Sequence, residues 1–213
     1  MIKNIKKAAL LTGVLCLAAA GGVMAYLTDY DMEDNQFTVG KVEIELQEPG
    51  WDPEEYTKIE PGKEIQKDPQ IKNTGVNDAF VYLEISVPMA DVTAADQEGN
   101  RLGQKMQELF SYQAGESWTN LTAEPVEGSM VYVYAYNEIL EPEETTEPLF
   151  ETMNFLNIIE GQLDMQQLTI PVRAYAIQTA YTGNDGGTVQ EKAKAAYEKY
   201  VNQNKNQEGQ VTA

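Results

Sequence analysis

Hydrophobic and polar residues alternate with a period of two along much of the chain, a pattern typical of β-strands with one buried face. Clear alternating stretches cover residues 42–46, 81–87, 131–136 and 168–176, and the last of them is the longest. Gly, Pro, Asn and Asp separate these stretches. About eight strands at this spacing predict an all-β, two-sheet sandwich.

Prolines and a change of period predict where some strands end. Pro88 should stop the strand at 81–87, and Pro69 should mark an edge strand or a strand start. The polar stretch 91–100 reads as a surface loop. Leu102, Met106, Leu109 and Phe110 have helical spacing and predict a short helix that leads into a strand near Tyr112. A short strand is expected at 118–121.

The last part of the chain changes from strand to helix periodicity. Residues 150–159 fit either a helix or a strand. After the turn at 183–187, apolar residues recur at helical spacing from Val189 to Val201. This pattern predicts one C-terminal helix at about 188–204. We expect the helix to cover the sandwich or an edge strand, and a partner-binding helix is the alternative.

The N-terminus has the layout of a secretory signal. Three lysines precede an uncharged stretch at 8–24, and Val23 and Ala25 fit the −3 and −1 positions of a cleavage site. We predict a signal peptide at 1–25 with cleavage before Tyr26. Residues 8–27 are also long enough for an uncleaved membrane anchor. Cys16 is the only cysteine, so the mature chain forms no disulfide.

Charge and composition exclude several functions. Without the three leader lysines, 12 basic residues face 34 acidic ones, which gives a net charge of −22. Such a polyanion repels nucleic acid and acidic membrane surfaces, so we expect contact with the membrane only before cleavage. The sequence contains no histidine, which removes the usual general base and His-based zinc sites. We expect no cofactor and no enzymatic activity.

Residues 26–36 are the main functional candidate. In a strand, Tyr26, Thr28, Tyr30 and Met32 would share one face, and the acidic residues would share the other. Such a strand suits addition to the open edge of a neighbouring subunit's sheet. A disordered terminus is the alternative. The domain at 37–213 would then be the acceptor.

The remaining candidates have simpler interpretations. Asp29, Asp31 and Glu33 lack the glycine and the acid that complete a calcium loop, and Asp91, Asp96 and Glu98 could form only a loose oxygen site. Two tryptophans could stack on sugar but are more often core or rim residues. Three alternating tyrosines are expected to pack. These five aromatic residues are Trp51, Trp118, Tyr132, Tyr134 and Tyr136.

Several motifs resemble those of the TasA/camelysin family. They are A-Y-L-T-D at 25–29, N-Q-F-T-V-G-K-V-E-I-E-L at 35–46, P-G-K-E-I-Q-K-D-P-Q-I-K-N-T-G at 61–75 and A-Y-A-I-Q-T-A at 174–180. The resemblance implies a jelly-roll fold, processing by a SipW-type signal peptidase, and a biofilm-matrix fibre protein of Gram-positive bacteria, outside the cell or at its surface. It implies self-assembly, with other matrix proteins or polysaccharide as further partners. Two alternatives stay open. One is an enzyme, either a camelysin-like protease, for which this sequence lacks zinc-binding histidines, or a carboxylate-based hydrolase. The other is a monomeric surface or carbohydrate-binding module.

The leader analysis makes the first prediction. The secreted protein should begin at Tyr26, because Val23 and Ala25 fit the small-residue pockets of a signal peptidase. Mass spectrometry of culture supernatant should find this N-terminus. Full-length chain recovered from membranes alone would contradict secretion.

Overall fold

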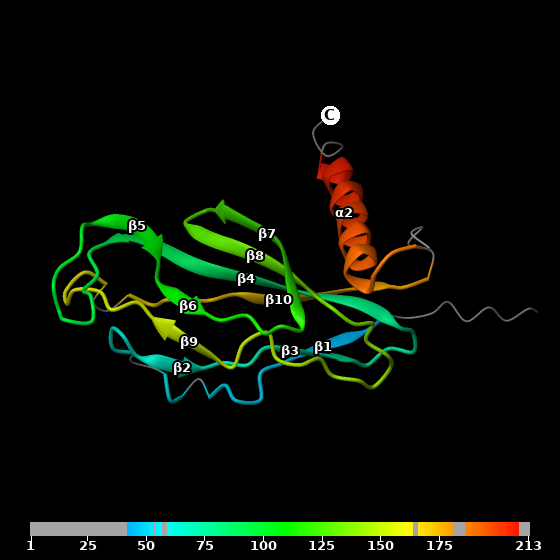
Figure 1. Cartoon of the computed structure of the whole chain (residues 1–213), viewed down its shortest axis with the longest axis horizontal. Helices are drawn as coiled ribbons and strands as arrows, with labels where there is room; N and C mark the ends of the chain where they lie inside the picture. The colour runs from blue at the N-terminus through cyan, green and yellow to red at the C-terminus, as the bar shows by residue number, and fades with distance from the viewer. Residues whose placement is uncertain (1–41, 53, 57–58, 164–165, 181–185, 209–213) are drawn as a thin grey trace, which may run out of the picture. The chain divides into compact units, whose positions relative to one another are not determined.

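Strand β4 (Ala79–Val92) is the central strand of an antiparallel sheet with the order β10-β4-β8-β7 (Figure 1). It pairs with β8 (Ser129–Tyr136) on one side and with β10 (Val172–Gln178) on the other. Strand β7 (Trp118–Val126) pairs with β8, and the short β5 (Lys105–Glu108) pairs with the last four residues of β4. This main sheet is one layer of the fold.

The structure is a computed structural model that describes residues 42–52, 54–56, 59–163, 166–180 and 186–208, with helix side chains described to residue 202. These residues belong to one compact unit that begins at Gly40. The predicted signal peptide and the segment at 26–36 lie outside the described residues, as does the motif at 35–41.

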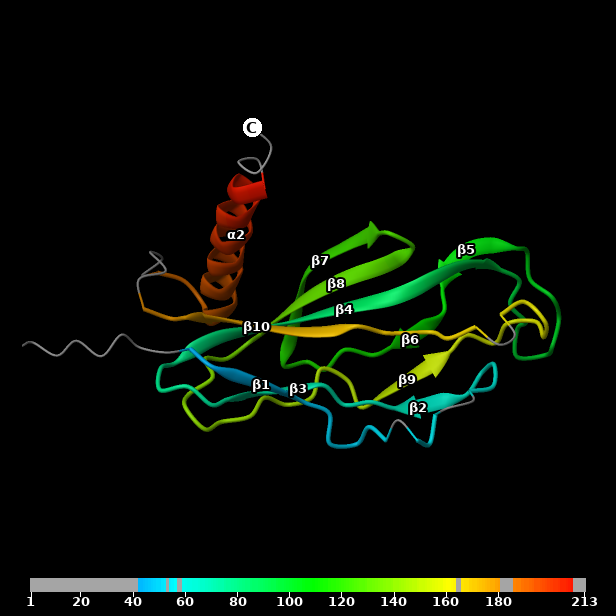
Figure 2. The same cartoon turned by 180° about the vertical axis from the view of Figure 1, so that it is seen from behind.

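Two smaller antiparallel sheets form the second layer. One pairs β1 (Ile44–Gln47) with β3 (Gln70–Asn73), and the other has the order β2 (Glu64–Gln66), β9 (Thr152–Phe155), β6 (Phe110–Tyr112). Strands β1, β3, β2 and β9 lie on the same side of the main sheet in both views (Figures 1 and 2). The predicted fold class, an all-β, jelly-roll-like sandwich, is confirmed.

The core fills the space between the layers with alternate side chains of each strand. Val81, Leu83 and Ile85 of β4 have no exposed surface, and Ile71 of β3 and Met153 of β9 join them in one cluster. The apolar area that these side chains remove from water is the main favourable term in folding. The described residues contain no cysteine, so this packing has no disulfide to assist it.

A C-terminal helix, α2 (Val189–Glu208), covers part of the opposite face of the main sheet. A capping box starts it: the Glu191 N–H donates to the Thr188 hydroxyl, and the Thr188 N–H donates to the Glu191 carboxylate. Ala193 and Ala196 are buried against Phe80 of β4 and neighbouring side chains. The prediction of a helix that covers the sandwich is confirmed, although the helix continues to Glu208, beyond the predicted end at about 204. No helix in the described part of the chain is long and apolar enough to span a bilayer.

The prediction that Pro88 ends its strand is wrong, because β4 continues to Val92. The N–H of Ser86 donates to Pro171 on the β10 side, and backbone groups alternate along a strand. Pro88 therefore lacks an N–H on this side, where its carbonyl accepts from the N–H of Leu109, the residue after β5. The Leu109 carbonyl, which an N–H at position 88 would meet, accepts from the N–H of Leu156 instead, so the strand tolerates the proline.

The predicted helix at 102–110 is also wrong. Those residues form β5 and β6, and Leu102 and Met106 are exposed at 47% and 60%. Only Leu109 and Phe110 enter the core. The ladder between β5 and the end of β4 overrides the local helical spacing, because pairing with a distant strand satisfies the backbone.

Three strand boundaries also differ from the prediction. The loop expected at 91–100 contains the end of β4 and the buried residues Val92 and Ala94. Strand β10 begins after Pro171 and is shorter than the 14 residues of β4, so the stretch at 168–176 is not the longest strand. The short strand at 118–121 extends to Val126, and the ambiguous stretch at 150–159 contains β9. Pro69 separates β2 from β3, as a strand-start proline should.

Candidate functional site

A groove of about 260 Å³ lies where β10, the residues that lead into β1, and α2 meet. Figure 2 shows β10 at the front of the main sheet, with β1 below it and α2 rising from its C-terminal end. Apolar and tyrosine side chains line the groove: Val42, Ile44, Tyr82, Ala174, Tyr175, Ala176, Ile177, Tyr197 and Tyr200. We call it the tyrosine groove.

Four tyrosines from three elements form the aromatic wall of the tyrosine groove. The rings of Tyr82 and Tyr197 have centroids 5.4 Å apart, and those of Tyr175 and Tyr200 are 6.1 Å apart. Tyr82 is fully buried, and its hydroxyl donates to the carbonyl of Ala193 in α2 at 2.7 Å. Tyr200, by contrast, is 39% exposed. The wall therefore has a fixed base and an open rim.

The hydroxyls of Tyr82, Tyr175 and Tyr197 have raised pKa values and stay neutral at physiological pH. Burial, helped by the nearby negative charge of Glu84, raises the pKa of Tyr175 to about 12, and burial also raises the pKa of Tyr82 and Tyr197. Glu84 accepts hydrogen bonds of 3.0 Å from both Tyr175 and Arg173. Arg173 neutralises the negative charge of Glu84, so the groove presents tyrosine rings and no unbalanced charge from Glu84.

Two hydrogen bonds fix which backbone groups of β10 face outward. The N–H of Ser86 donates to Pro171, and the N–H of Thr179 donates to Asp78. Since backbone groups point to alternate sides of a strand, the odd-numbered residues between 171 and 179 face β4. The outward residues are Val172, Ala174, Ala176 and Gln178. Among the described strands, β10 pairs with β4 alone, so these groups lie at a sheet edge.

The opposite edge of the main sheet, β7, is blocked. Glu127 and Gly128 have φ values of 46° and 82°, which make the β7–β8 connection a type I′ turn. Val126 and Ser129 are then a hydrogen-bonded pair, so Pro125 stands where an N–H would point away from β8. A register shift between Asn120 and Thr122 interrupts the ladder further. Prolines and bulges are known devices against edge pairing, and β10 has neither within its seven residues.

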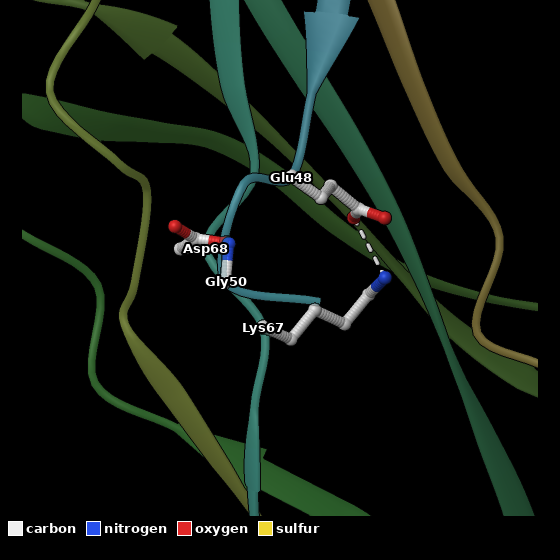
Figure 3. Close-up of polar contacts among 4 residues, drawn as sticks. All are labelled: Glu48, Gly50, Lys67 and Asp68. Atoms are coloured by element: carbon white, nitrogen blue, oxygen red, sulfur yellow. Dashed lines mark hydrogen bonds and ion pairs between the residues drawn. The ribbon is translucent and has the colours of Figure 1, made fainter. Parts of the chain in front are cut away.

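A clamp holds the chain directly after β1 against the segment between β2 and β3. Lys67 Nζ lies 2.6 Å from Glu48 Oε1, with 9% and 20% of the two side chains exposed (Figure 3). Next to this pair, the N–H of Gly50 donates to Asp68 Oδ1 at 2.8 Å. With the β1–β3 ladder, the clamp keeps Val42 and Ile44 beside β10.

The predicted functional residues of the N-terminus lie outside the described residues. They are the cleavage-site residues Val23, Ala25 and Tyr26, the strand residues Thr28, Tyr30 and Met32, and the acids Asp29, Asp31 and Glu33. Their roles stay predictions.

The loose oxygen site at Asp91, Asp96 and Glu98 does not form. Asp91 accepts a hydrogen bond from Gln104, whereas Asp96 accepts two from Asn100, which lower its pKa. Across the described ranges, no three His, Cys, Asp or Glu side chains are grouped so that they could hold a metal ion.

Neither tryptophan has the free ring face that sugar stacking needs. Trp51 stacks on Tyr56 with centroids 5.1 Å apart, and Lys67 Nζ lies 4.8 Å from the Trp51 ring. Trp118 is buried and donates to the carbonyl of Glu147. The tyrosines of β8 pack, as expected, and Tyr134 belongs to the main core.

Sequence reasoning missed the acceptor side of the groove, although its signals were present. The sequence pattern assigns Ala174 and Ala176 to a strand and indicates nothing further. Two small side chains on one face of a strand, however, leave space for another chain at a sheet edge. The motif K-D-P at 67–69 was noted for its resemblance alone. A lysine and an aspartate before a strand-start proline could have indicated a structural clamp.

Comparison with known proteins gives one match. The family model described as Camelysin metallo-endopeptidase matches residues 1–127, which is more than half of the chain. The matched range includes strands β1 to β7 and both sides of the clamp. No curated protein and no solved structure matches the chain.

The clamp makes the second prediction. Lys67→Met should lower the free energy of unfolding by about 3 kcal/mol, because it leaves the Glu48 carboxylate without its buried partner. Lys72→Met is the matched control, since Lys72 pairs with Glu143 at 3.0 Å on the surface. It should cost less than about 1 kcal/mol. Urea denaturation measures both, and equal losses would mean that the clamp is an ordinary surface pair.

Proposed function

The chain belongs to the camelysin metallo-endopeptidase family, and we propose that it is a secreted, non-enzymatic matrix protein that assembles into fibres by N-terminal strand exchange. One observation carries the proposal: among the described strands, β10 pairs on one edge only and leaves the other edge open, while the far edge of the main sheet is blocked at Pro125 of β7. A protein that avoided all edge pairing would protect both edges.

The N-terminal segment has the pattern that such an edge requires. Its backbone would pair with the outward groups of β10 in the next subunit. About four or five hydrogen bonds, each worth roughly 1 kcal/mol, would form. The face with Tyr26, Thr28, Tyr30 and Met32 would enter the tyrosine groove and add apolar burial. The groove offers matching apolar rings and no unpaired charge from Glu84.

The other face of the segment suits an assembled polyanion. Asp29, Asp31 and Glu33 would remain in water, where no buried charge has to be compensated. Cleavage by a SipW-type signal peptidase would act as the switch, since it separates the segment from its hydrophobic leader. Assembly would then occur outside the cell, in the matrix or at the cell surface.

The family description favours a second candidate, a cell-surface metalloprotease. Two observations support the non-enzymatic proposal against it. The sequence has no histidine, and the described residues hold no grouped metal ligands. A carbohydrate-binding module draws less support from the two tryptophans, because both rings are already in contact with protein groups.

The third prediction concerns catalysis. The purified mature chain should not hydrolyse casein at a measurable rate, because it has neither histidine nor cysteine to supply a base, a nucleophile or a conventional zinc site. A fluorescent casein assay with and without EDTA tests this. Activity that survives rigorous purification and disappears with the chelator would favour the protease.

The fourth prediction concerns strand exchange. Tyr30→Asp should block assembly, because burying an unpaired charge costs several kcal/mol, comparable with the whole strand contact. Asp31→Asn is the control on the solvated face and should be nearly neutral. Sedimentation and electron microscopy of the mature protein measure polymer formation.

Thermal unfolding of the monomer separates the possible failures. Both variants should unfold like the wild type, since the segment pairs between subunits. Equal polymerisation of wild type and Tyr30→Asp would refute strand exchange. A monomer destabilised by Tyr30→Asp would instead mean that the segment completes its own sandwich.

A further inference from the structure

We infer that helix α2 forms part of a strand-binding site in the tyrosine groove, and that its Tyr200 side chain packs over the strand that a second copy adds to β10. The inference rests on the proposed function and deepens it. It assigns a binding role to a helix that otherwise only covers the sheet, and it names the partner as the residue 26–36 segment of another copy.

Tyr200 is the residue of the aromatic wall that a bound strand would bury further. Its ring lies 6.1 Å from that of Tyr175 on β10, yet 39% of the residue is exposed. A large aromatic side chain at the rim of an apolar groove gains by burial when a ligand fills the groove. The ligand in this inference is a strand, because β10, which forms the floor, pairs with β4 alone among the described strands.

The position of α2 is fixed by close contacts with the sheet. Ala193 and Ala196 are small, so the helix can approach β4 and β8 closely. The Tyr82 hydroxyl then bonds to the carbonyl of Ala193 at 2.7 Å, one helical turn before Tyr197. Tyr82 is therefore a positioning residue, because it sets where the Tyr197 and Tyr200 rings stand above β10.

The length of the N-terminal segment favours a second copy as the occupant. Residues 26–41 precede Val42, which itself lines the groove. These 16 residues can span about 50 Å when extended, enough to reach a neighbouring subunit. The segment also carries two tyrosines and a methionine on one face, side chains that pack well against aromatic rings.

The test measures the critical concentration for polymerisation of the mature chain, 26–213, by sedimentation. Tyr200→Ala should raise it about tenfold, and Tyr200→Phe should leave it within about twofold, since the ring and not the hydroxyl makes the contact. Tyr82→Phe should give a smaller rise through the shifted helix. Lys194→Ala is the control, because Lys194 is exposed on α2 and does not line the groove.

A double-mutant cycle separates direct contact from loss of structure. Tyr200→Ala is combined in turn with Tyr26→Ala, Tyr30→Ala and Met32→Ala. At least one pair should raise the critical concentration by clearly less than the product of the single effects, which a structural defect in α2 would not produce. Additive effects in all three pairs would overturn the contact.

The outcomes distinguish this inference from the proposed function. If Tyr30→Asp blocks assembly but Tyr200→Ala has no effect, strand exchange stands and the role of α2 is refuted. A wild-type chain that stays monomeric at every concentration would overturn both. In that case protection of Tyr200 from nitration in the monomer would identify the chain's own segment as the occupant.

Discussion

Pairing on both sides of β4 is the constraint on which this structure depends. The strand is buried over most of its length, so its backbone groups need partners along each edge. Strand β8 meets this need on one side, and β10 and β5 share the other. Strand β10 completes the pairing of β4, and among the described strands none pairs with its other side. Strand β10 is therefore an edge strand beside the core.

The two ends of the main sheet deal with their exposed backbones in different ways. At β7, Pro125 and a register shift remove the regular donors that another chain could use. At β10, small residues leave the ladder regular, and α2 and β1 border it without pairing to it among the described strands. An edge that is regular, apolar on its groove side and bordered by aromatic rings is suited to accept one particular strand.

Local pattern predicted those parts of the fold in which burial alternates strictly along one strand. The stretches 81–87 and 131–136 and the C-terminal helix belong to this group. The local pattern gave a wrong prediction at 102–110. There the exposed Leu102 and Met106 happen to have helical spacing with the buried Leu109 and Phe110. The local pattern also failed at Pro88, because the strand tolerates that proline only where Leu156, a residue distant in the sequence, bonds to the carbonyl of Leu109. The small residues of β10 were a signal for the acceptor edge, but the groove as a whole could not be predicted, since it requires β1, β10 and α2 to meet.

The clamp suggests what the family motif at 61–75 preserves in this chain. Lys67 and Asp68 hold the residues after β1, and the next motif element, Asn73, is fully buried. The Asn73 amide donates to the carbonyls of Asn77 and Leu140 and accepts from Gly75, which joins β3 to two loops. None of these side chains is arranged as a metal ligand or a base. The motif therefore fixes β1 and β3 in place, and with them the border of the groove.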